Sequence, residues 1–536
     1  MIFDALPATP NYCSQTQPAT APTLTGRILA VGLLIWWVVP FLFFFVVAAP
    51  GGLELEFRFG LKSGAMALVL AVLLAAFLRL ASMGGSLWEI WQRRRRRAIE
   101  MEWALPNSER IRPVSIVMSV HGGREQVVET VDRLLALNYP RFEVIVVNDG
   151  SPDGTLACLT EAFSLHPTSR IIQKSIPVQA EPTLYASAKH PQLTVVAKPE
   201  TGREDSLNCG LNVSRYPLVC ALDSRITLDA DALTELARGF IENVTQTVAV
   251  SCLAEFLGDA PTPKGSDICL SADEGVAPVR MAPRPVAGAA VAPSPLIDLQ
   301  RIDRAALFHT QWLLRAGVGN VAMLPGVVSL LKKTEIVAAG GYRTGYTADT
   351  LDLLLTAYQV RKSDELRQVL FLPEIVAWIM PFNSLDEAML ARVAVTQESF
   401  SVIVRHLRLI LRGQGDWRAR LALPVFIVAV VFAPIWEWLA IVLVDVTALA
   451  GGITFDELVA LLLMFAAVGL ADSLGGLLCD EASNRRCRSV SEILHLGLAA
   501  IAHAITFRWM MGLAQLRGML TYISGRSVHG TIPLSR

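Results

Sequence analysis

The sequence has little charge and no closely paired cysteines. Charged residues make up only 18% of the chain and the formal net charge is −1, so no bulk attraction to nucleic acid is expected. The eight cysteines are scattered without a Cys-x-x-Cys motif, and we interpret them as reduced thiols, with a metal site as the alternative. The polar first 24 residues and the long apolar run after them do not match a cleavable signal peptide.

Hydrophobic residues are abundant instead, at 53% of the chain, and the mean hydropathy is +0.45. This composition is too apolar for an ordinary soluble protein and too charged for one that lies wholly within a membrane. A bilayer core about 30 Å thick needs roughly 20 apolar residues in one helix. Five segments have this length and are apolar on all faces, which predicts membrane spans at 28–49, 64–84, 421–444, 457–478 and 491–513.

The placement of arginine predicts the orientation of these spans. The run Arg93–Arg97 follows the second span, so the region 98–420 is expected on the cytoplasmic side. A fifth crossing would place the C-terminus outside, whereas the arginines of the last segment, 516–536, favour the inside. A re-entrant last segment or a further crossing would remove this conflict, and both alternatives stay open.

The same patterns divide the chain into parts. Residues 257–296 are rich in Pro, Ala and Gly and predict a flexible insertion within the cytoplasmic domain. Apolar residues at helical spacing among arginines predict an amphipathic helix at the inner membrane interface, with a plain surface helix of the domain as the alternative. The predicted parts are a polar tail at 1–24, two spans within 25–90, an α/β domain at 98–383, the interfacial helix at 384–420, about three spans within 421–515 and a C-terminal tail at 516–536.

Several ionisable residues fall in or near the predicted spans. Glu437 and Asp472 lie within spans, so their side chains are expected to face protein or water rather than lipid. His503 lies in an apolar run and is expected to form a hydrogen bond between spans. Two other histidines, His309 and His406, are expected on a helix surface or at the membrane interface.

The cytoplasmic region begins with a βαβ pattern. Runs rich in β-formers at 113–120 and 142–149 flank a helical segment at 124–137, which predicts a parallel sheet with a right-handed crossover. The runs 193–198 and 217–223 continue the sheet. Ligands of such sheets bind beyond the carboxyl ends of the strands. Asp149, Gly150 and Ser151 follow the second strand and predict an acceptor for a base or ribose beside a tight turn.

Five stretches in a fixed order identify a family. They are VNDGSPDG (147–154), LNCGLNVSRYPLVCALD (207–223), LPGVVSLLKK (324–333), GGY (340–342) and LPVFIVAVVFAPIWEW (423–438). In this order the chain resembles the bacterial membrane-bound family 2 glycosyltransferases, which include cellulose, hyaluronan and poly-N-acetylglucosamine synthases. The resemblance implies a cytoplasmic α/β domain of the GT-A type, a multi-span helical region in the bacterial inner membrane, and sugar transfer from a UDP-sugar to a glycan acceptor. It also implies Mg²⁺ or Mn²⁺ as cofactor.

The polar motifs of this family are all changed here. The chain has Thr201, Gly202 and Arg203 in place of Gly-Gly-Lys, and Asp223, Ser224 and Arg225 in place of Asp-x-Asp. Asp349 and Thr350 stand in place of the acidic pair, with Thr350 at the position of the catalytic base, and Ala391 to Val395 stand in place of Gln-x-x-Arg-Trp.

These changes affect metal binding and proton transfer. Asp223 is the candidate metal ligand, but Arg225 cannot ligate a cation, and Mg²⁺ about 4 Å away would meet a repulsion of about 4 kcal/mol at an effective dielectric near 20. Arg203 and Arg225 together fit the oxygens of a diphosphate without metal. Thr350 is no useful base near neutral pH, and Asp349 or a later acid, Asp352, would need a shift in register.

Two hypotheses follow. In the first, the chain transfers sugar from a UDP-sugar, using Asp349 as the catalytic carboxylate and six residues to bind the nucleotide: Asp149, Gly150, Ser151, Arg203, Asp223 and Arg225. In the second, it is an inactive glycosyltransferase-like protein that acts as a partner or regulator of a catalytic polysaccharide synthase.

Overall fold

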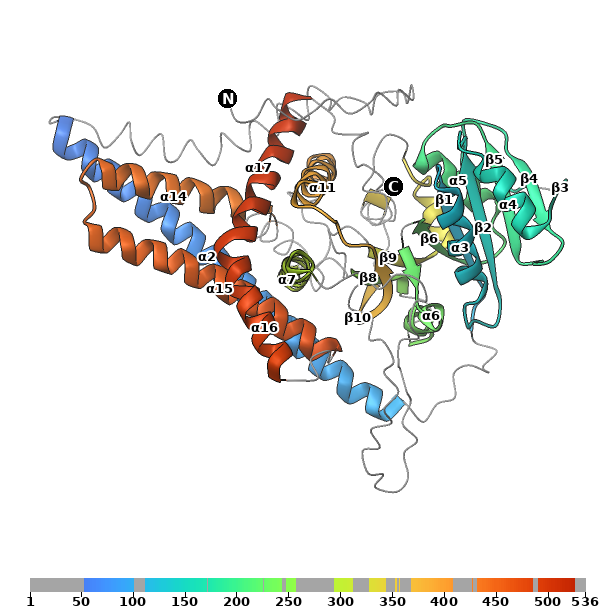
Figure 1. The fold of residues 1–536 in the computed structure, drawn as a ribbon, viewed down its shortest axis with the longest axis horizontal. Helices are drawn as coiled ribbons and strands as arrows, with labels where there is room; N and C mark the ends of the chain where they lie inside the picture. The colour runs from blue at the N-terminus through green and yellow to red at the C-terminus, as the bar shows by residue number, and fades with distance from the viewer. Residues whose placement is uncertain are drawn as a thin grey trace, which may run out of the picture.

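The computed structural model describes a central α/β sheet and a group of long helices (Figure 1). The described residues are 53–100, 111–170, 172–224, 226–242, 247–256, 294–311, 327–343, 352–353, 356, 368–407, 427, 431–484 and 490–525. The predicted span 28–49, Arg225, Asp349, Thr350 and most of the predicted insertion lie outside these residues.

The sheet has ten strands in the order β3-β4-β5-β2-β1-β6-β9-β8-β10-β7. Its centre is formed by β1 (Val114–Val120), β2 (Phe142–Asp149), β5 (Leu193–Lys198) and β6 (Leu218–Asp223), which pair in parallel as the sequence predicted. The other strands are β3 (Leu165–Thr168), β4 (Thr183–Ser187), β7 (Ile226–Leu228), β8 (Thr247–Phe256), β9 (Val327–Lys332) and β10 (Gln368–Ile379). β7 was not predicted, because a turn was expected directly between Asp223 and the next helix.

Helices cover both faces of the sheet, which is why the central strands are apolar on both faces. Ile116 and Met118 pack against the helices of one face, and Val117 packs against the helix of the other. The first face carries α3 (Arg124–Leu135), α4 (Thr155–Phe163) and α6 (Ala232–Glu242), and the second carries α5 (Arg203–Val213). Gly210 allows α5 to lie close to the sheet, since a Cβ there would be 2.3 Å from Val117 Cγ1.

The long helices are α2 (Leu53–Glu100), α14 (Ala433–Leu449), α15 (Phe455–Asn484), α16 (Val490–Ala502) and α17 (Arg508–Ser524), with a π-helical turn, His503–Phe507, joining the last two. Within the described part of the chain, three helices are long and apolar enough to cross a membrane: Phe57–Gln92, Phe455–Ser483 and Ser491–Ser524. They contain three of the predicted spans. α17 runs to Ser524, so the C-terminal tail does not begin at 516 as predicted.

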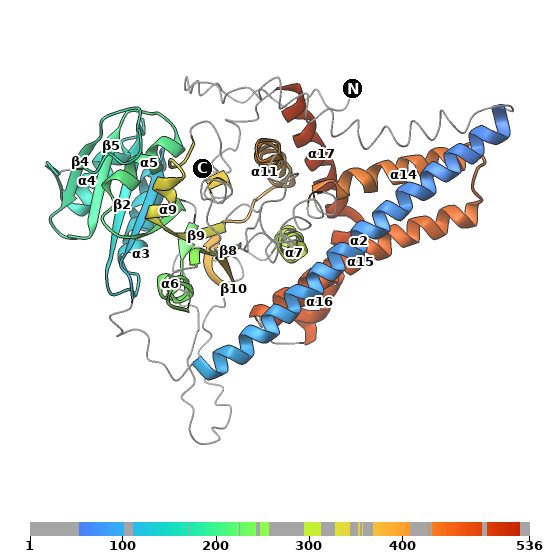
Figure 2. The same ribbon diagram turned by 180° about the vertical axis from the view of Figure 1, so that it is seen from behind.

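Two helices lie between the sheet and the long helices in both views (Figures 1 and 2). These are α7 (Pro295–Thr310) and α11 (Leu385–Arg405). Ser294 caps α7 by accepting a hydrogen bond from the Leu296 backbone N–H, so the predicted insertion 257–296 ends in helix rather than in flexible chain. α7 packs closely on α15, because a Cβ at Gly476 would lie 2.6 Å from the Ala306 backbone. α7 thus joins the sheet domain to the apolar helices.

Candidate functional site

The chain changes direction across the sheet at the carboxyl ends of β1 and β6. β2 and β5 extend the sheet on one side of β1, and the chain then returns to place β6 on the other side. Ser119 near the end of β1 pairs with Asp223 at the end of β6. Such a switch point leaves a crevice in which α/β proteins bind their ligands. The loops after β1, β2 and β5 border the same edge.

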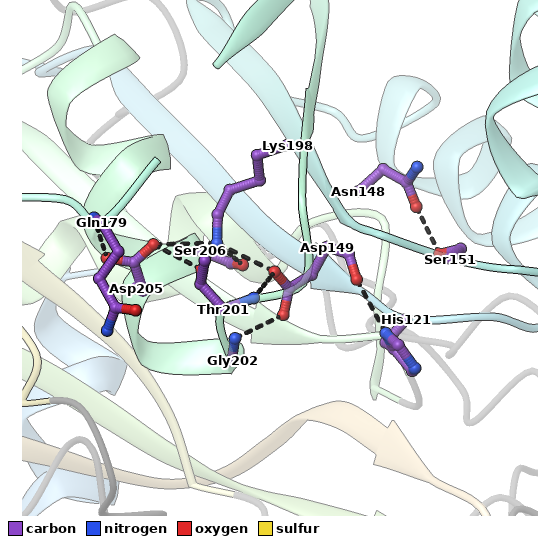
Figure 3. Close-up of polar contacts among 10 residues, drawn as sticks. All are labelled: His121, Asn148, Asp149, Ser151, Gln179, Lys198, Thr201, Gly202, Asp205 and Ser206. Carbon is purple, nitrogen blue, oxygen red and sulfur yellow. Dashed lines mark hydrogen bonds and ion pairs between the residues drawn. The ribbon is translucent and has the colours of Figure 1, made fainter. Parts of the chain in front are cut away.

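Asp149, at the end of β2, organises this edge (Figure 3). Its Oδ1 accepts hydrogen bonds from the Thr201 backbone N–H and from Lys198 Nζ, both at 2.9 Å. Its Oδ2 accepts a hydrogen bond from the Gly202 backbone N–H, also at 2.9 Å. Three internal donors therefore hold this carboxylate, which fixes the loop that leads into α5.

Lys198 is a buried cation between two carboxylates. Its Nζ lies 2.9 Å from Asp149 Oδ1 and 2.9 Å from Asp205 Oδ2, and its side chain is fully buried. Asp205 also accepts hydrogen bonds from Thr201 Oγ1 at 2.6 Å and from the Gln179 backbone N–H at 2.9 Å. The sequence analysis did not identify Lys198 or Asp205, although a lysine at a strand end followed by an acid at a helix start is the available signal.

The loop after β1 is tied to the loop after β2. The backbone N–H of Gly122 donates to Ser151 Oγ at 2.9 Å, and His121 Nδ1 donates to the Asp149 carbonyl at 2.8 Å. Gly150 has φ of +63°, and a Cβ there would lie 2.6 Å from the Glu200 backbone nitrogen. Only glycine fits both constraints, so the three loops form one preorganised rim.

Five predicted site residues lie on this rim or directly beside it. Asp149, Gly150 and Ser151 belong to the β2 loop, Arg203 is the first residue of α5, and Asp223 is the last residue of β6. The N-terminus of a helix favours an anionic ligand, although α5 has acidic residues in its own first turn. The other predicted residues, Arg225, Asp349 and Thr350, lie outside the described ranges.

The residues described by the structure do not fit a divalent metal. Among them, no three His, Cys, Asp or Glu side chains are grouped so that they could hold one. The sequence adds an arginine, Arg225, two positions after the candidate ligand Asp223. We therefore derive no step through a metal ion.

α5 connects the rim to the Gly-Gly-Tyr turn. The Asn208 amide donates to the Tyr342 carbonyl at 2.6 Å and accepts from the Tyr342 backbone N–H at 2.8 Å. Gly341 has φ of +81°, and a Cβ there would lie 2.5 Å from Asn208 Oδ1. The glycine is therefore needed for this contact, which gives a physical reason for one of the motifs found in the sequence.

Asp352 is held by side chains of α11 and of its C-cap. Arg405 Nη1 lies 3.2 Å from both carboxylate oxygens, and His406 Nε2 lies 2.9 Å from Oδ1. Burial alone raises the pKa of Asp352, but the hydrogen bond with His406 and the charges of Arg405 and Arg343 lower the pKa below its ordinary value. Asp352 is consequently a weak base. His406, expected on a surface, is 1% exposed, because it is a partner of this buried acid.

Comparison with known proteins finds a family match within the chain. Residues 115–287 match the family described as Glycosyl transferase family 2. The predicted resemblance to family 2 glycosyltransferases is confirmed. Two Staphylococcus epidermidis poly-beta-1,6-N-acetyl-D-glucosamine synthases match over 135 residues, with 25% and 24% identity. This match covers 25% of the chain and 27% of the length of those relatives.

Two solved structures are also similar to this chain. One is a mannosyltransferase from Pyrobaculum calidifontis in complex with GDP-Man and Mn²⁺. Its alignment covers 82% of this chain and 99% of the mannosyltransferase chain, with 16% identity and a TM-score of 0.45. The other is residues 1–349 of S. aureus TarS in complex with UDP-GlcNAc. Its alignment covers 69% of this chain and 91% of the TarS chain, with 13% identity and a TM-score of 0.32. The GT-A-like fold predicted from the sequence is confirmed by the sheet together with the family match.

Four charged residues meet among the apolar helices, outside the sheet domain. Arg79 lies 2.9 Å from both Glu437 Oε1 and Asp472 Oδ2, and Arg508 lies 2.5 Å and 3.4 Å from the same two oxygens. Glu437 and Asp472 are 5% and 6% exposed. Both acids therefore face protein rather than lipid, as the sequence predicted.

The histidines of this region are also buried. His503 Nδ1 lies 2.8 Å from Ser473 Oγ on α15, which confirms the predicted hydrogen bond between spans. His309 Nδ1 lies 2.6 Å from Ser86 Oγ on α2. His309 is 3% exposed, so of its two predicted positions, a helix surface or the membrane interface, the helix surface is wrong. The reason is that α7 is enclosed by the long helices on the side that carries this residue.

Two cavities lie at the junction between the domain and the long helices. The inner cavity, of about 80 Å³, contains the charged quartet, His503, Trp438 and Trp509. Arg79 Nε, Asp472 Oδ1, Trp438 Nε1 and His503 Nε2 are buried there without hydrogen-bond partners, an arrangement that suits ordered water. The outer cavity, of about 140 Å³, lies between α7, α11 and α17. Asp303 and Arg392, which form an ion pair, line both cavities.

Proposed function

We propose that this chain binds a nucleotide-activated sugar, of the UDP type, as a membrane-embedded protein of polysaccharide synthesis. The observation that supports this function is the rim at the switch point, where Asp149 fixes the loop that places Arg203 at the start of α5. Arg203 stands at this edge, and a guanidinium there matches the oxygens of a diphosphate. Asp223 lies at the end of β6, on the other side of the switch point.

In this proposal Asp149 shapes the site more than it contacts the ligand. Its carboxylate is occupied by Thr201, Gly202 and Lys198, so the base or ribose would meet the loops around it. We place the sheet domain on the cytoplasmic side of the bacterial inner membrane, since Arg93–Arg97 follow the apolar part of α2.

Nucleotide binding can be tested by calorimetry on the full-length protein in detergent, with UDP and UDP-sugars. Loss of a charge-assisted hydrogen bond costs about 1.5–3 kcal/mol, so Arg203→Met should raise Kd by about 10- to 100-fold. Lys62→Met is a matched control, because Lys62 lies on α2 and pairs with an exposed glutamate, Glu457. Equal Kd values for wild type and Arg203→Met, or no binding at all, would contradict the proposal.

The same titration with and without Mg²⁺ tests whether nucleotide binding depends on a divalent metal. Binding that is unchanged by Mg²⁺ is expected, because the diphosphate is to be neutralised by arginine rather than by a cation. A marked gain in affinity with Mg²⁺ would show that Asp223 binds metal despite Arg225.

A second candidate function is that of an inactive partner of a catalytic synthase. The position of Asp352 favours it, since this acid is held by Arg405 and His406 and has a lowered pKa. Release of UDP from a UDP-sugar distinguishes the two functions. Turnover that disappears in Asp349→Ala supports the transferase, and nucleotide binding without turnover supports the partner.

A further inference from the structure

The walls of the outer cavity are mainly hydrocarbon. Its lining residues include members of the end of β8 and of α7, α11 and α17. Leu307 of α7, Val395 of α11 and Met511 of α17 face it from three helices. Aromatic rings complete the walls, contributed by Phe256, Phe382 and Phe507.

Several polar side chains in the walls are already occupied by protein. The Gln300 amide donates to the Phe382 carbonyl at 3.0 Å and accepts from the Phe382 backbone N–H at 3.1 Å. Gln515 Nε2 donates to a backbone carbonyl at 3.4 Å, and Thr396 Oγ1 donates to the carbonyl of the preceding turn at 2.8 Å. A ligand rich in hydroxyl groups would find few of these polar groups unoccupied, and its own groups would lose hydrogen bonds to water.

The changed family motif lies in this cavity. Ala391 and Val395 both line it, and they stand where related glycosyltransferases have Gln and Trp. An amide and a broad aromatic face, which suit a sugar ring, are replaced by a methyl and an isopropyl group. The cavity lies beside the sheet domain, and its walls are mainly apolar, although three charged residues also line it, namely Asp303, Arg304 and Arg392, the first and last of which pair with each other.

The cavity also adjoins surfaces that suit the bilayer. Met511 lines the cavity, while Leu513 and Leu520 of the same helix are 43% and 54% exposed. α17 belongs to the stretch Ser491–Ser524, which is long and apolar enough to cross a membrane. A hydrocarbon chain is therefore the apolar group that is abundant next to this site.

We propose that the outer cavity binds the hydrocarbon chain of a membrane lipid. An apolar cavity of about 150 Å³ holds a benzene-sized group, so a cavity of about 140 Å³ accommodates a short segment of such a chain. The lipid chain occupies the place at which a glycan acceptor would meet the family motif. This inference goes beyond the proposed function, because lipid binding requires neither a nucleotide nor sugar transfer.

Photo-crosslinking in liposomes tests the proposal. The full-length protein is reconstituted with phosphatidylethanolamine and phosphatidylglycerol, including a phosphatidylethanolamine with a diazirine in one acyl chain. After irradiation, labelled peptides are mapped by mass spectrometry. We expect label on the cavity-facing residues Ala391, Val395 and Met511 in addition to the outer surface of the helices. Label confined to the outer surface would overturn the proposal.

Two variants fill the cavity to different extents. Val395→Trp should lower the cavity label about tenfold relative to the outer label on the same molecules, equivalent to about 1.4 kcal/mol of binding, and Ala391→Gln should lower it less. The matched control is Leu498→Trp, on an α16 side chain that is 68% exposed, and it should leave the cavity label unchanged. Undiminished cavity label in both cavity variants would contradict the proposal.

A saccharide competitor separates the lipid from a glycan occupant. An oligomer of β-1,6-linked N-acetylglucosamine should not displace the cavity label, and displacement would overturn the proposal in favour of a glycan. UDP binding is measured on the same samples. Because the two readouts are independent, failure of nucleotide binding leaves the lipid result interpretable, and failure of lipid labelling leaves the nucleotide result interpretable.

Discussion

The sheet edge and the helix junction both bury ionised groups, but they satisfy them in different ways. At the sheet edge, Lys198 lies between Asp149 and Asp205. The backbone N–H groups of Thr201 and Gly202 donate to the Asp149 carboxylate. In the helix junction two arginines face two acids, yet Arg79 Nε and Asp472 Oδ1 remain without partners.

The difference comes from the backbone. A loop has N–H groups that no regular structure uses, and these can turn toward a carboxylate. Inside a long helix each N–H already donates to the carbonyl four residues earlier, so a buried charge depends on other side chains or on water. This contrast explains why backbone donors satisfy the ions of the sheet edge, while polar atoms of the junction remain without partners in a cavity.

The largest expected effect comes from removing the cation of the sheet edge. Lys198→Met leaves two buried carboxylates without their shared cation, which should cost about 3–5 kcal/mol. The apparent melting temperature of the full-length protein should fall accordingly. Lys174→Met is the control, since Lys174 pairs with Glu181 at the surface and should leave the melting temperature unchanged. Similar melting curves for both variants would refute the contrast between the two regions.

A smaller effect is expected from the corresponding change in the junction. In Arg79→Met, Arg508 still contacts both Glu437 and Asp472, so the loss should be about 1–3 kcal/mol. Adding Glu437→Gln removes the excess negative charge and should restore part of the stability. A loss as large as that of Lys198→Met would mean that the remaining arginine and water do not compensate.

Asp352 links the domain to α11, and its contribution should depend on pH. Its folded pKa is lowered, so its ion pairs stabilise the protein above the ordinary pKa of about 3.9 and the contribution is lost as the pH falls through the folded value. Asp352→Asn should therefore lower the melting temperature at pH 7, with a difference that shrinks below about pH 4. A difference that grows in acid would show that the pKa shift has the opposite sign.

The smallest effect concerns thiols in the core of the sheet domain. Burial raises the pKa of Cys209 to about 11 and of Cys220 to about 12. A maleimide at pH 8 should modify them at least about 100-fold more slowly than half-buried Cys158, because the thiolate is the reacting form. Peptide mapping after timed quenching gives the rates. Equal rates in the native protein, with no added denaturant, would show that the core of the sheet domain opens readily.

The sequence predicted the central strands because their runs are rich in β-formers. The runs 113–120, 142–149, 193–198 and 217–223 became β1, β2, β5 and β6 with small changes at their ends. It did not predict β7 or the start of α7 inside the Pro-rich segment, because a short strand and a capped helix start depend on neighbours that are distant in the chain. The burial of His309 and His406 was not predicted for the same reason.

The sequence by itself determined the long apolar helices, the parallel sheet and the strand-end loops. Hydrophobic periodicity and glycine placement, on which these features depend, are properties of neighbouring residues. Only the tertiary structure decided that Asp149 is enclosed by Lys198 and the 201–202 loop, that Asp352 is paired with α11, and that Ala391 and Val395 line a cavity. These contacts join residues tens to hundreds of positions apart, and a sequence does not state which of its distant polar groups are close enough to neutralise one another.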